Sequence, residues 1–201
     1  MSSIVSMMVT RCSVTSIASV LIVLCTTLGN PAAGEPSRLM TEEFAPYQYY
    51  KDVDDKETLT GISIEIVSAI QERLGDENEI KVLPWSRGLK LLQKHPNSAL
   101  FSTARTPDRE DKYKWVGPLS ELQMVFFRRK GSGVGFSSMD EARAIGRIGV
   151  TKNVATHEIL SNMGFENLDV LQSGADEKNI ARLLKDRIDV WPTAYYAGVY
   201  M

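Results

Sequence analysis

The stretch FSTARTPDRE, residues 101–110, follows an apolar run and contains two arginines and three hydroxyl side chains. Arg105 and Arg109 stand close to several acidic residues, so surface ion pairs are one interpretation. In the other interpretation, one guanidinium donates two parallel hydrogen bonds to the carboxylate of a ligand, and the hydroxyl of Ser102 or Thr103 completes the site. The residues themselves leave both interpretations open.

Aromatic side chains near the ends of expected strands are a second group that could contact a ligand. Phe44 and Tyr47 come after the first expected strand, and Trp85 and Trp191 lie near the ends of two others. Aromatic rings in such places stack on ligands and shape pockets. They equally well cap the hydrophobic core at the ends of a sheet.

These residues belong to a chain in which short apolar runs alternate with longer amphipathic segments, the pattern of an α/β protein with mainly parallel strands. Strands are expected at 38–41, 80–83, 98–102, 147–150, 168–171 and 188–193, and helices at 62–74, 86–94, 154–163 and 176–185. In the first helix, Ile62, Ile66, Ile70 and Leu74 are expected to form the buried face, and Gly75 to end it.

The chain also contains a weak internal repeat. Segments 82–103 and 170–193 both contain Val-Leu, a helix with a Leu-Leu pair, a strand and a final threonine, so Thr103 and Thr193 end corresponding strands. The repeat predicts two lobes, and we assign residues 35–125 to the first and 126–201 to the second. Because ligands bind beyond the carboxyl ends of parallel strands, Arg109 would line a cleft between the lobes.

Residues 1–34 have the features of a secretory signal peptide, with a basic residue, an uncharged apolar run and small residues after it. The run is short for a membrane span, so we expect export to the periplasm and cleavage near Ala33 or Gly34. The two cysteines, Cys12 and Cys25, both lie in this leader. Disulfides would therefore not stabilise the mature protein.

Composition and spacing argue against several classes of partner. The formal net charge is −2 and the basic residues are scattered, which argues against nucleic-acid binding. His95 and His157 have no acidic or cysteine neighbours at ligand spacing, which argues against a zinc site. In GSGVGF, Phe136 replaces the third glycine of a dinucleotide-binding loop. We expect no cofactor and no metal.

Six segments carry a resemblance to a known family. They are FAPYQY, LTGISIEIVSAI, LPWSRGLKLL, TARTPDREDKYKWVGPL, IGVTKNVATHEIL and DRIDVWPTAYYAG. In this order they resemble bacterial periplasmic solute-binding proteins of the amino-acid-binding family, family 3 of the ABC-transporter substrate-binding proteins. The resemblance implies a two-lobe periplasmic binding protein fold. It also implies a monomer that catalyses nothing, traps a small polar solute between its lobes and delivers it to a membrane ABC permease.

The resemblance also implies roles for individual residues. Arg109 would hold the carboxylate of the ligand, Ser102 and Ala104 would assist it, and Phe44 would form an aromatic lid. The candidate ligand-binding residues are Arg109, Ser102, Thr103, Ala104, Phe44, Tyr47, Trp85, Asn153, Trp191 and Thr193.

Two departures from the family pattern bear on the ligand. The segment from Asn153 to Ala155 replaces a frequent Gly-Thr-Thr, and the two residues after Thr193 are not acidic where a partner for an ammonium group is expected. We therefore expect either a carboxylate without an α-ammonium group or another small polar solute, bound against Trp85, Trp191 and Tyr195.

Two other functions remain open. Some relatives are dehydratases acting on cyclohexadienyl acids, and such an enzyme would need a general acid, for which Glu121 and Asp189 are candidates. A ligand-sensing subunit of a signalling system would use the same pair of lobes. The family normally returns to the first lobe after the helix that TAYYAGVYM resembles, so we expect a truncated chain with both lobes incomplete.

Overall fold

The computed structural model describes residues 2–9, 38–172, 176 and 178–201. Its strands are β1 (Ser2–Val9), β2 (Arg38–Thr41), β3 (Tyr49–Val53), β4 (Lys56–Thr60), β5 (Ile80–Val82), β6 (Ser98–Ala104), β7 (Lys114–Arg128), β8 (Ile148–Thr151), β9 (Leu168–Leu171) and β10 (Val190–Ala194). Its helices are α1 (Ile62–Leu74), α2 (Trp85–Lys94), α3 (Pro107–Glu110), α4 (Met139–Arg143), α5 (Ala155–Asn162), α6 (Lys178–Leu184) and α7 (Tyr195–Tyr200).

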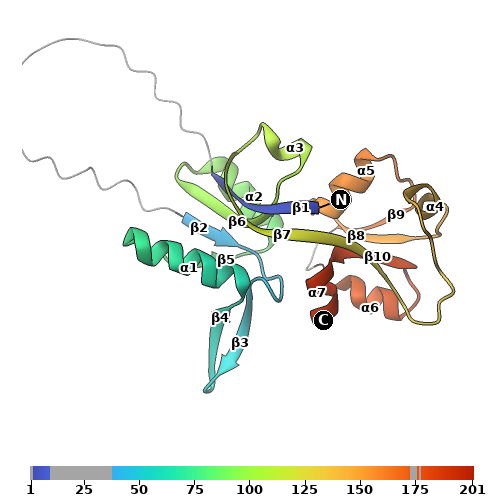
Figure 1. Ribbon diagram of the computed structural model, residues 1–201, viewed down its shortest axis with the longest axis horizontal. Coiled ribbons are helices and arrows are strands. Elements are labelled where there is room, and N and C mark those ends of the chain that lie inside the picture. The colour runs from blue at the N-terminus through green and yellow to red at the C-terminus, as the bar shows by residue number, and fades with distance from the viewer. Residues whose placement is uncertain (1, 10–37, 173–175, 177) are drawn as a thin grey trace, which may run out of the picture.

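One eight-stranded sheet connects the two halves of the molecule, in the order β5-β2-β6-β1-β7-β10-β8-β9. In the N-terminal half, β2 lies parallel between β5 and β6, and in the C-terminal half, β8 lies parallel between β9 and β10. The long strand β7 runs through both halves (Figure 1), pairing first with β1 and then, from Met124 onward, with β10. The internal repeat of the sequence therefore corresponds to two lobes with the same strand order.

Each lobe has helices on both faces of its part of the sheet. Neighbouring residues of a strand point to opposite faces, so Leu39 packs in a cluster with residues of α1 while Met40 packs with Leu92 of α2. In the same way, Val190 packs in a cluster with a residue of α5 and Trp191 in a cluster with one of α6. The predicted α/β class is confirmed, and the carboxyl ends of the parallel strands in both lobes are left free to line a site.

The expected strands and helices from residue 38 onward are confirmed, with small differences at their ends. The hairpin of β3 and β4 was not predicted, because its residues are polar and mostly exposed and show no apolar alternation. Its turn contains Asp54 and Asp55 with φ angles of 50° and 59°, which suit the tight turns that fit the twist of a hairpin. The hairpin projects from the N-terminal lobe (Figure 1).

The predicted buried face of α1 is wrong. Ile62, Ile70 and Leu74 are 43%, 42% and 75% exposed, whereas Ile64 and Val67 are buried against the sheet. Both sets of residues have helical spacing, so spacing alone could not choose between them. The choice follows from where α1 lies on β2 and β6, which provide the partners of Ile64 and Val67.

β1 lies within residues 1–34, the segment predicted as a leader. Its backbone pairs antiparallel with β6 on one side and with β7 on the other. The rest of that segment, with the predicted cleavage site, lies outside the described residues. No helix among the described residues has the length and apolar character needed to cross a membrane. The leader stays a prediction, and its removal would take β1 out of the sheet.

Gly61 holds the loop that carries Phe44 against the start of α1. The first amides of α1, at Ile62 and Ser63, donate to the carbonyl oxygens of Pro46 and Tyr47, at 3.2 and 2.8 Å. Gly61 has a φ of 120°, and a Cβ atom there would lie 2.5 Å from the Tyr47 carbonyl oxygen. No side chain fits between these backbone segments.

We expect Gly61→Ala to lower the free energy of unfolding by about 2 kcal/mol or more, through backbone strain and overpacking. Gly135→Ala is the matched control, because a Cβ at Gly135 would meet only an arginine side chain, at 3.8 Å. It should change stability by less than about 0.5 kcal/mol. Urea unfolding of both variants measures the difference, and equal stabilities would contradict this account of the loop.

Candidate functional site

An open cavity lies between the lobes. Its walls are Glu42, Glu43, Phe44, Trp85, Ser102, Ala104 and Arg109 from the N-terminal lobe, Leu122 and Met124 from β7, and Val154, Ala155, Thr156, Asp176, Thr193 and Ala194 from the C-terminal lobe. The segments that follow β2, β6, β8 and β10 all contribute to it. The cavity therefore lies beyond the carboxyl ends of parallel strands of both lobes, where open α/β sheets bind ligands.

Arg109 crosses from α3 towards the C-terminal lobe and is only 4% exposed. Its Nη1 donates to the carbonyl oxygen of Ala104 at 3.3 Å, and its Nη2 donates to the carbonyl oxygen of Asn153 at 3.1 Å. Nη2 also pairs with Oε1 of Glu158 at 2.8 Å, and the guanidinium lies 5.1 Å from the ring centre of Trp85. Arg109 is thus enclosed between the lobes.

Arg105 has a different environment, although it belongs to the same segment. Its side chain is 45% exposed and pairs with the carboxylate of Glu110. This hydrogen-bonded partner lowers the pKa of Glu110. For Arg105, the interpretation as a surface ion pair is confirmed.

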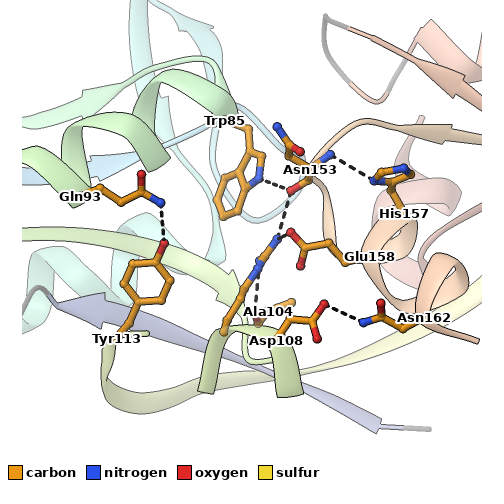
Figure 2. Close-up of polar contacts among 10 residues, drawn as sticks. Trp85, Gln93, Ala104, Asp108, Tyr113, Asn153, His157, Glu158 and Asn162 are labelled. Carbon is orange, nitrogen blue, oxygen red and sulfur yellow. Dashed lines mark hydrogen bonds and ion pairs between the residues drawn. The ribbon is translucent and has the colours of Figure 1, made fainter. Parts of the chain in front are cut away.

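Two more polar contacts hold the lobes together (Figure 2). Nε1 of Trp85 donates to the carbonyl oxygen of Asn153 at 2.6 Å, and Nδ2 of Asn162 donates to Oδ2 of Asp108 at 2.6 Å. Asn153 has a φ of 65°, a conformation that asparagine adopts more readily than most residues. This conformation turns one carbonyl group towards both Trp85 and Arg109, so a single turn after β8 links the C-terminal lobe to two side chains of the other lobe.

Two hydroxyl groups of the cavity wall are buried without a hydrogen-bond partner in the described part of the chain. One is Oγ of Ser102, at the end of β6, where φ is 57°, and the other is Oγ1 of Thr156 in the first turn of α5. Buried polar groups are normally paired, so both hydroxyls are available to a ligand. Thr156 was not among the predicted residues, because it lies one position beyond the segment from Asn153 to Ala155 that corresponds to the Gly-Thr-Thr of the family.

Asp176 is the second residue that sequence reasoning missed. Its Oδ1 accepts hydrogen bonds from Thr151 at 2.8 Å and Asn179 at 3.0 Å, and its Oδ2 accepts from Nε1 of Trp191 at 3.0 Å. Burial raises the pKa of Asp176, and these hydrogen bonds partly oppose the rise. The residues after Thr193 are not acidic, but the cavity does contain acids, because Asp176 reaches it from the loop before α6 and Glu42 and Glu43 follow β2.

The predicted residues differ in whether they line the cavity. Phe44, Trp85, Ser102, Ala104, Arg109 and Thr193 line the cavity, and Asn153 lines adjoining hollows. Three residues line none of these spaces. Tyr47 stacks on Phe44 and is 3% exposed, Thr103 is fully buried and donates to the carbonyl oxygen of Leu100, and Trp191 is buried beside Asp176. Trp191 can therefore act on a ligand only through Asp176.

Neither candidate general acid lies in the cavity. Glu121 is exposed on β7, and Asp189 accepts a hydrogen bond from the backbone nitrogen of Arg147 at 2.7 Å. Within the described ranges, no cluster of histidine, cysteine, aspartate and glutamate residues has the geometry to hold a metal ion. Glu42 and Glu43 line the cavity, and two further carboxylates between the lobes, Asp176 and Glu158, are both hydrogen-bonded to neighbouring side chains.

The family of bacterial extracellular solute-binding proteins, family 3, matches residues 38–191 of the chain. The chain belongs to this family. The matched range includes every residue of the cavity wall except Thr193 and Ala194. As a member of the family, this solute-binding protein has the two-lobe fold that the resemblance implied. None of the curated proteins compared with the chain matches it.

Several solved structures are similar to this solute-binding protein. The amino acid ABC transporter substrate-binding protein AbpA of Streptococcus pneumoniae, bound to L-arginine, has a TM-score of 0.66 and 20% identity, over 81% of this chain and 69% of that one. An ancestral arginine-binding protein bound to arginine has a TM-score of 0.67 and 20% identity, over 82% and 72%. The ancestral amino acid-binding protein AncCDT-1, a precursor of cyclohexadienyl dehydratase, has a TM-score of 0.66 and 18% identity, over 82% and 72%. At these identities the likeness establishes the fold.

The raised pKa of Asp176 predicts a particular dependence of stability on pH. The folded state keeps the proton of Asp176 to a higher pH than the unfolded chain does. The protonated side chain therefore makes its full contribution to the free energy of unfolding below the ordinary aspartate pKa. This contribution is lost as the pH rises through the raised value. As the pH rises above about 4, the unfolding free energy of the natural chain should fall relative to Asp176→Asn, by at most about 1.4 kcal/mol per pH unit.

Urea unfolding at a series of pH values measures this difference. Asp140→Asn serves as the control, because the Asp140 side chain is 95% exposed and its removal should leave the pH profile unchanged. If Asp176→Asn and the natural chain show parallel profiles, Asp176 does not have a raised pKa.

Proposed function

We propose that this solute-binding protein binds an amino acid in the cavity between its lobes and delivers it to an ABC importer. The observation that carries the proposal is the presence of a basic and an acidic side chain on one cavity, one from each lobe. Arg109 reaches the cavity from the N-terminal lobe and Asp176 from the C-terminal lobe. An amino acid offers a carboxylate and an ammonium group a few atoms apart, so it can interact with both.

The carboxylate would bind beside Arg109. The hydroxyls of Ser102 and Thr156 line the same cavity and have no other partner in the described ranges. Thr156 lies in the first turn of α5, where free amide groups and the helix dipole favour an anion. A carboxylate that accepts from the two hydroxyls as well as from the guanidinium would satisfy both hydroxyls, which are otherwise buried unpaired.

The ammonium group would bind beside Asp176. A cation at this position offsets the cost of burying the charged carboxylate. Because the raised pKa of Asp176 favours its protonated form, binding of the cation should release that proton. Phe44, Trp85 and Met124 form the apolar part of the wall and would surround the side chain of the solute. This charge distribution replaces our expectation of a ligand without an α-ammonium group.

Binding fits the cavity better than catalysis does. An enzyme of the dehydratase type needs a general acid with a free proton path to the substrate, and both acids considered for that role lie elsewhere. Asp176 is fixed by donors from three side chains, which suits a receptor group for a cation. We therefore expect no turnover of cyclohexadienyl acids, and measurable product would instead establish the enzymatic alternative.

The proposal is tested by a thermal-shift screen of amino acids, each compared with its decarboxylated amine and its deaminated acid. The intact amino acid should stabilise the protein more than either derivative does. Arg109→Ala should weaken binding of the hit by about 2 to 5 kcal/mol, the usual cost of removing one partner of a buried charge pair. Asp176→Asn should selectively reduce the contribution of the ammonium group to the affinity for the amino acid.

The matched control is Arg105→Ala, which removes a neighbouring arginine of the same segment that pairs at the surface. Calorimetry should give this variant the affinity of the natural chain. Equal affinity of the Arg109→Ala variant and the natural chain would show that the carboxylate binds elsewhere.

Delivery to an importer requires export, and we propose that residues 1–34 direct it. Mass spectrometry of the protein recovered from the periplasm of a bacterial host should show a mature N-terminus near Ala33 or Gly34. A stable intact N-terminus on cytoplasmic protein would contradict the proposal. A sensor subunit would be exported too, so uptake of the labelled amino acid with the cognate permease distinguishes it from an import protein.

A further inference from the structure

Arg109 and Glu158 form an ion pair across the cleft, one partner from each lobe. Oε1 of Glu158 lies 2.8 Å from Nη2 of Arg109, and the two side chains are 24% and 5% exposed respectively. Within the described part of the chain, Arg109 makes no other ion pair. Glu158 belongs to α5, two residues beyond Thr156, so its carboxylate approaches Arg109 from the C-terminal lobe.

The ion pair compensates the charge of the Arg109 guanidinium, which would otherwise be buried without a counter-ion when the lobes close. A buried guanidinium without an anion is strongly destabilising, whereas in an open cleft the same group would be hydrated. The carbonyl oxygens of Ala104 and Asn153 accept hydrogen bonds from Arg109 but carry no formal charge. Glu158 supplies the negative charge, and the lobes can therefore close without a solute.

The geometry of the pair also leaves room for a better partner. Glu158 contacts the guanidinium through one oxygen, and its other oxygen, Oε2, is buried without a hydrogen-bond partner among the described residues. A planar guanidinium binds a carboxylate best through two parallel hydrogen bonds. A free carboxylate could make that contact and would then take the place of Glu158.

We propose that Glu158 is a specificity-determining residue that acts as a built-in carboxylate. It occupies Arg109 when no solute is present, keeps the lobes closed, and must be displaced by the carboxylate of an incoming solute. Weakly binding carboxylates fail this competition. The claim that Glu158 keeps the lobes closed rests on the structure alone. Only the claim that a solute carboxylate competes with Glu158 rests on the proposed function.

The first test needs no ligand and uses the full chain. Phenylglyoxal modifies accessible arginines, and peptide mass spectrometry reports the rate for each one. Glu158→Gln should raise the rate at Arg109 by about tenfold relative to Arg105, because couplings of this kind typically change an equilibrium by about 5- to 150-fold. The radius of gyration from small-angle X-ray scattering should increase in the same variant.

Asp108→Asn is the matched control. It removes the charge of the Asp108 side chain, which accepts a hydrogen bond from Asn162 of the other lobe, but leaves the charges of Arg109 and Glu158 in place. Its Arg109 rate should stay within about twofold of the natural chain. Glu158→Asp keeps the charge on a side chain one methylene shorter and should give an intermediate rate, so the comparison stands even if Glu158→Gln folds poorly.

An unchanged Arg109 rate in both Glu158 variants would overturn the proposal, as would an unchanged radius of gyration for folded Glu158→Gln. The second test is calorimetry with the amino acid found by thermal shift, which should bind Glu158→Gln about tenfold more tightly. Weaker or equal binding would overturn the competition. If the screen gives no amino acid, the proposed function fails, while the phenylglyoxal rates still decide whether Glu158 closes the lobes.

Discussion

A guanidinium buried between two lobes must be compensated, and much of the architecture around the cavity follows from this requirement. The short helix α3 turns the chain so that Arg109 points back under the end of β6 and towards the other lobe. Each lobe then supplies one backbone carbonyl oxygen, and α5 supplies the carboxylate of Glu158. Without these partners, a closed cleft would enclose an unpaired positive charge.

The sheet explains why these groups meet at all. Strand β7 belongs to both lobes, and on each side of it three parallel strands follow the same order, so the carboxyl ends of both sets face one cleft. A polar residue after any of these strands is brought near the cavity regardless of its distance along the chain. Arg109 and Asp176 are 67 positions apart, yet the shared topology places them on one cavity wall.

Much of the fold could be predicted because it depends on local patterns. Apolar runs and the left-handed Gly75 after α1 depend on neighbours in sequence. The β3–β4 hairpin could not be predicted, since its polar residues carry no such pattern. The prediction of the buried face of α1 was wrong because two sets of apolar residues had suitable spacing. Only the position of the helix on the sheet distinguishes Ile64 from Ile70.

For the site, the sequence by itself determined which residues lie at or just after the ends of strands, among them Ser102 and Arg109. Local hydrophobic periodicity is enough to give the order of the strands and helices. Only the tertiary structure decided which of these side chains share a cavity. Thr103 lies next to Ser102 but points into the core, while Asp176 and Thr156 reach the cavity from segments that no motif marked. Burial and charge pairing depend on distances between lobes, and those distances are set by packing across β7 instead of by any spacing along the chain.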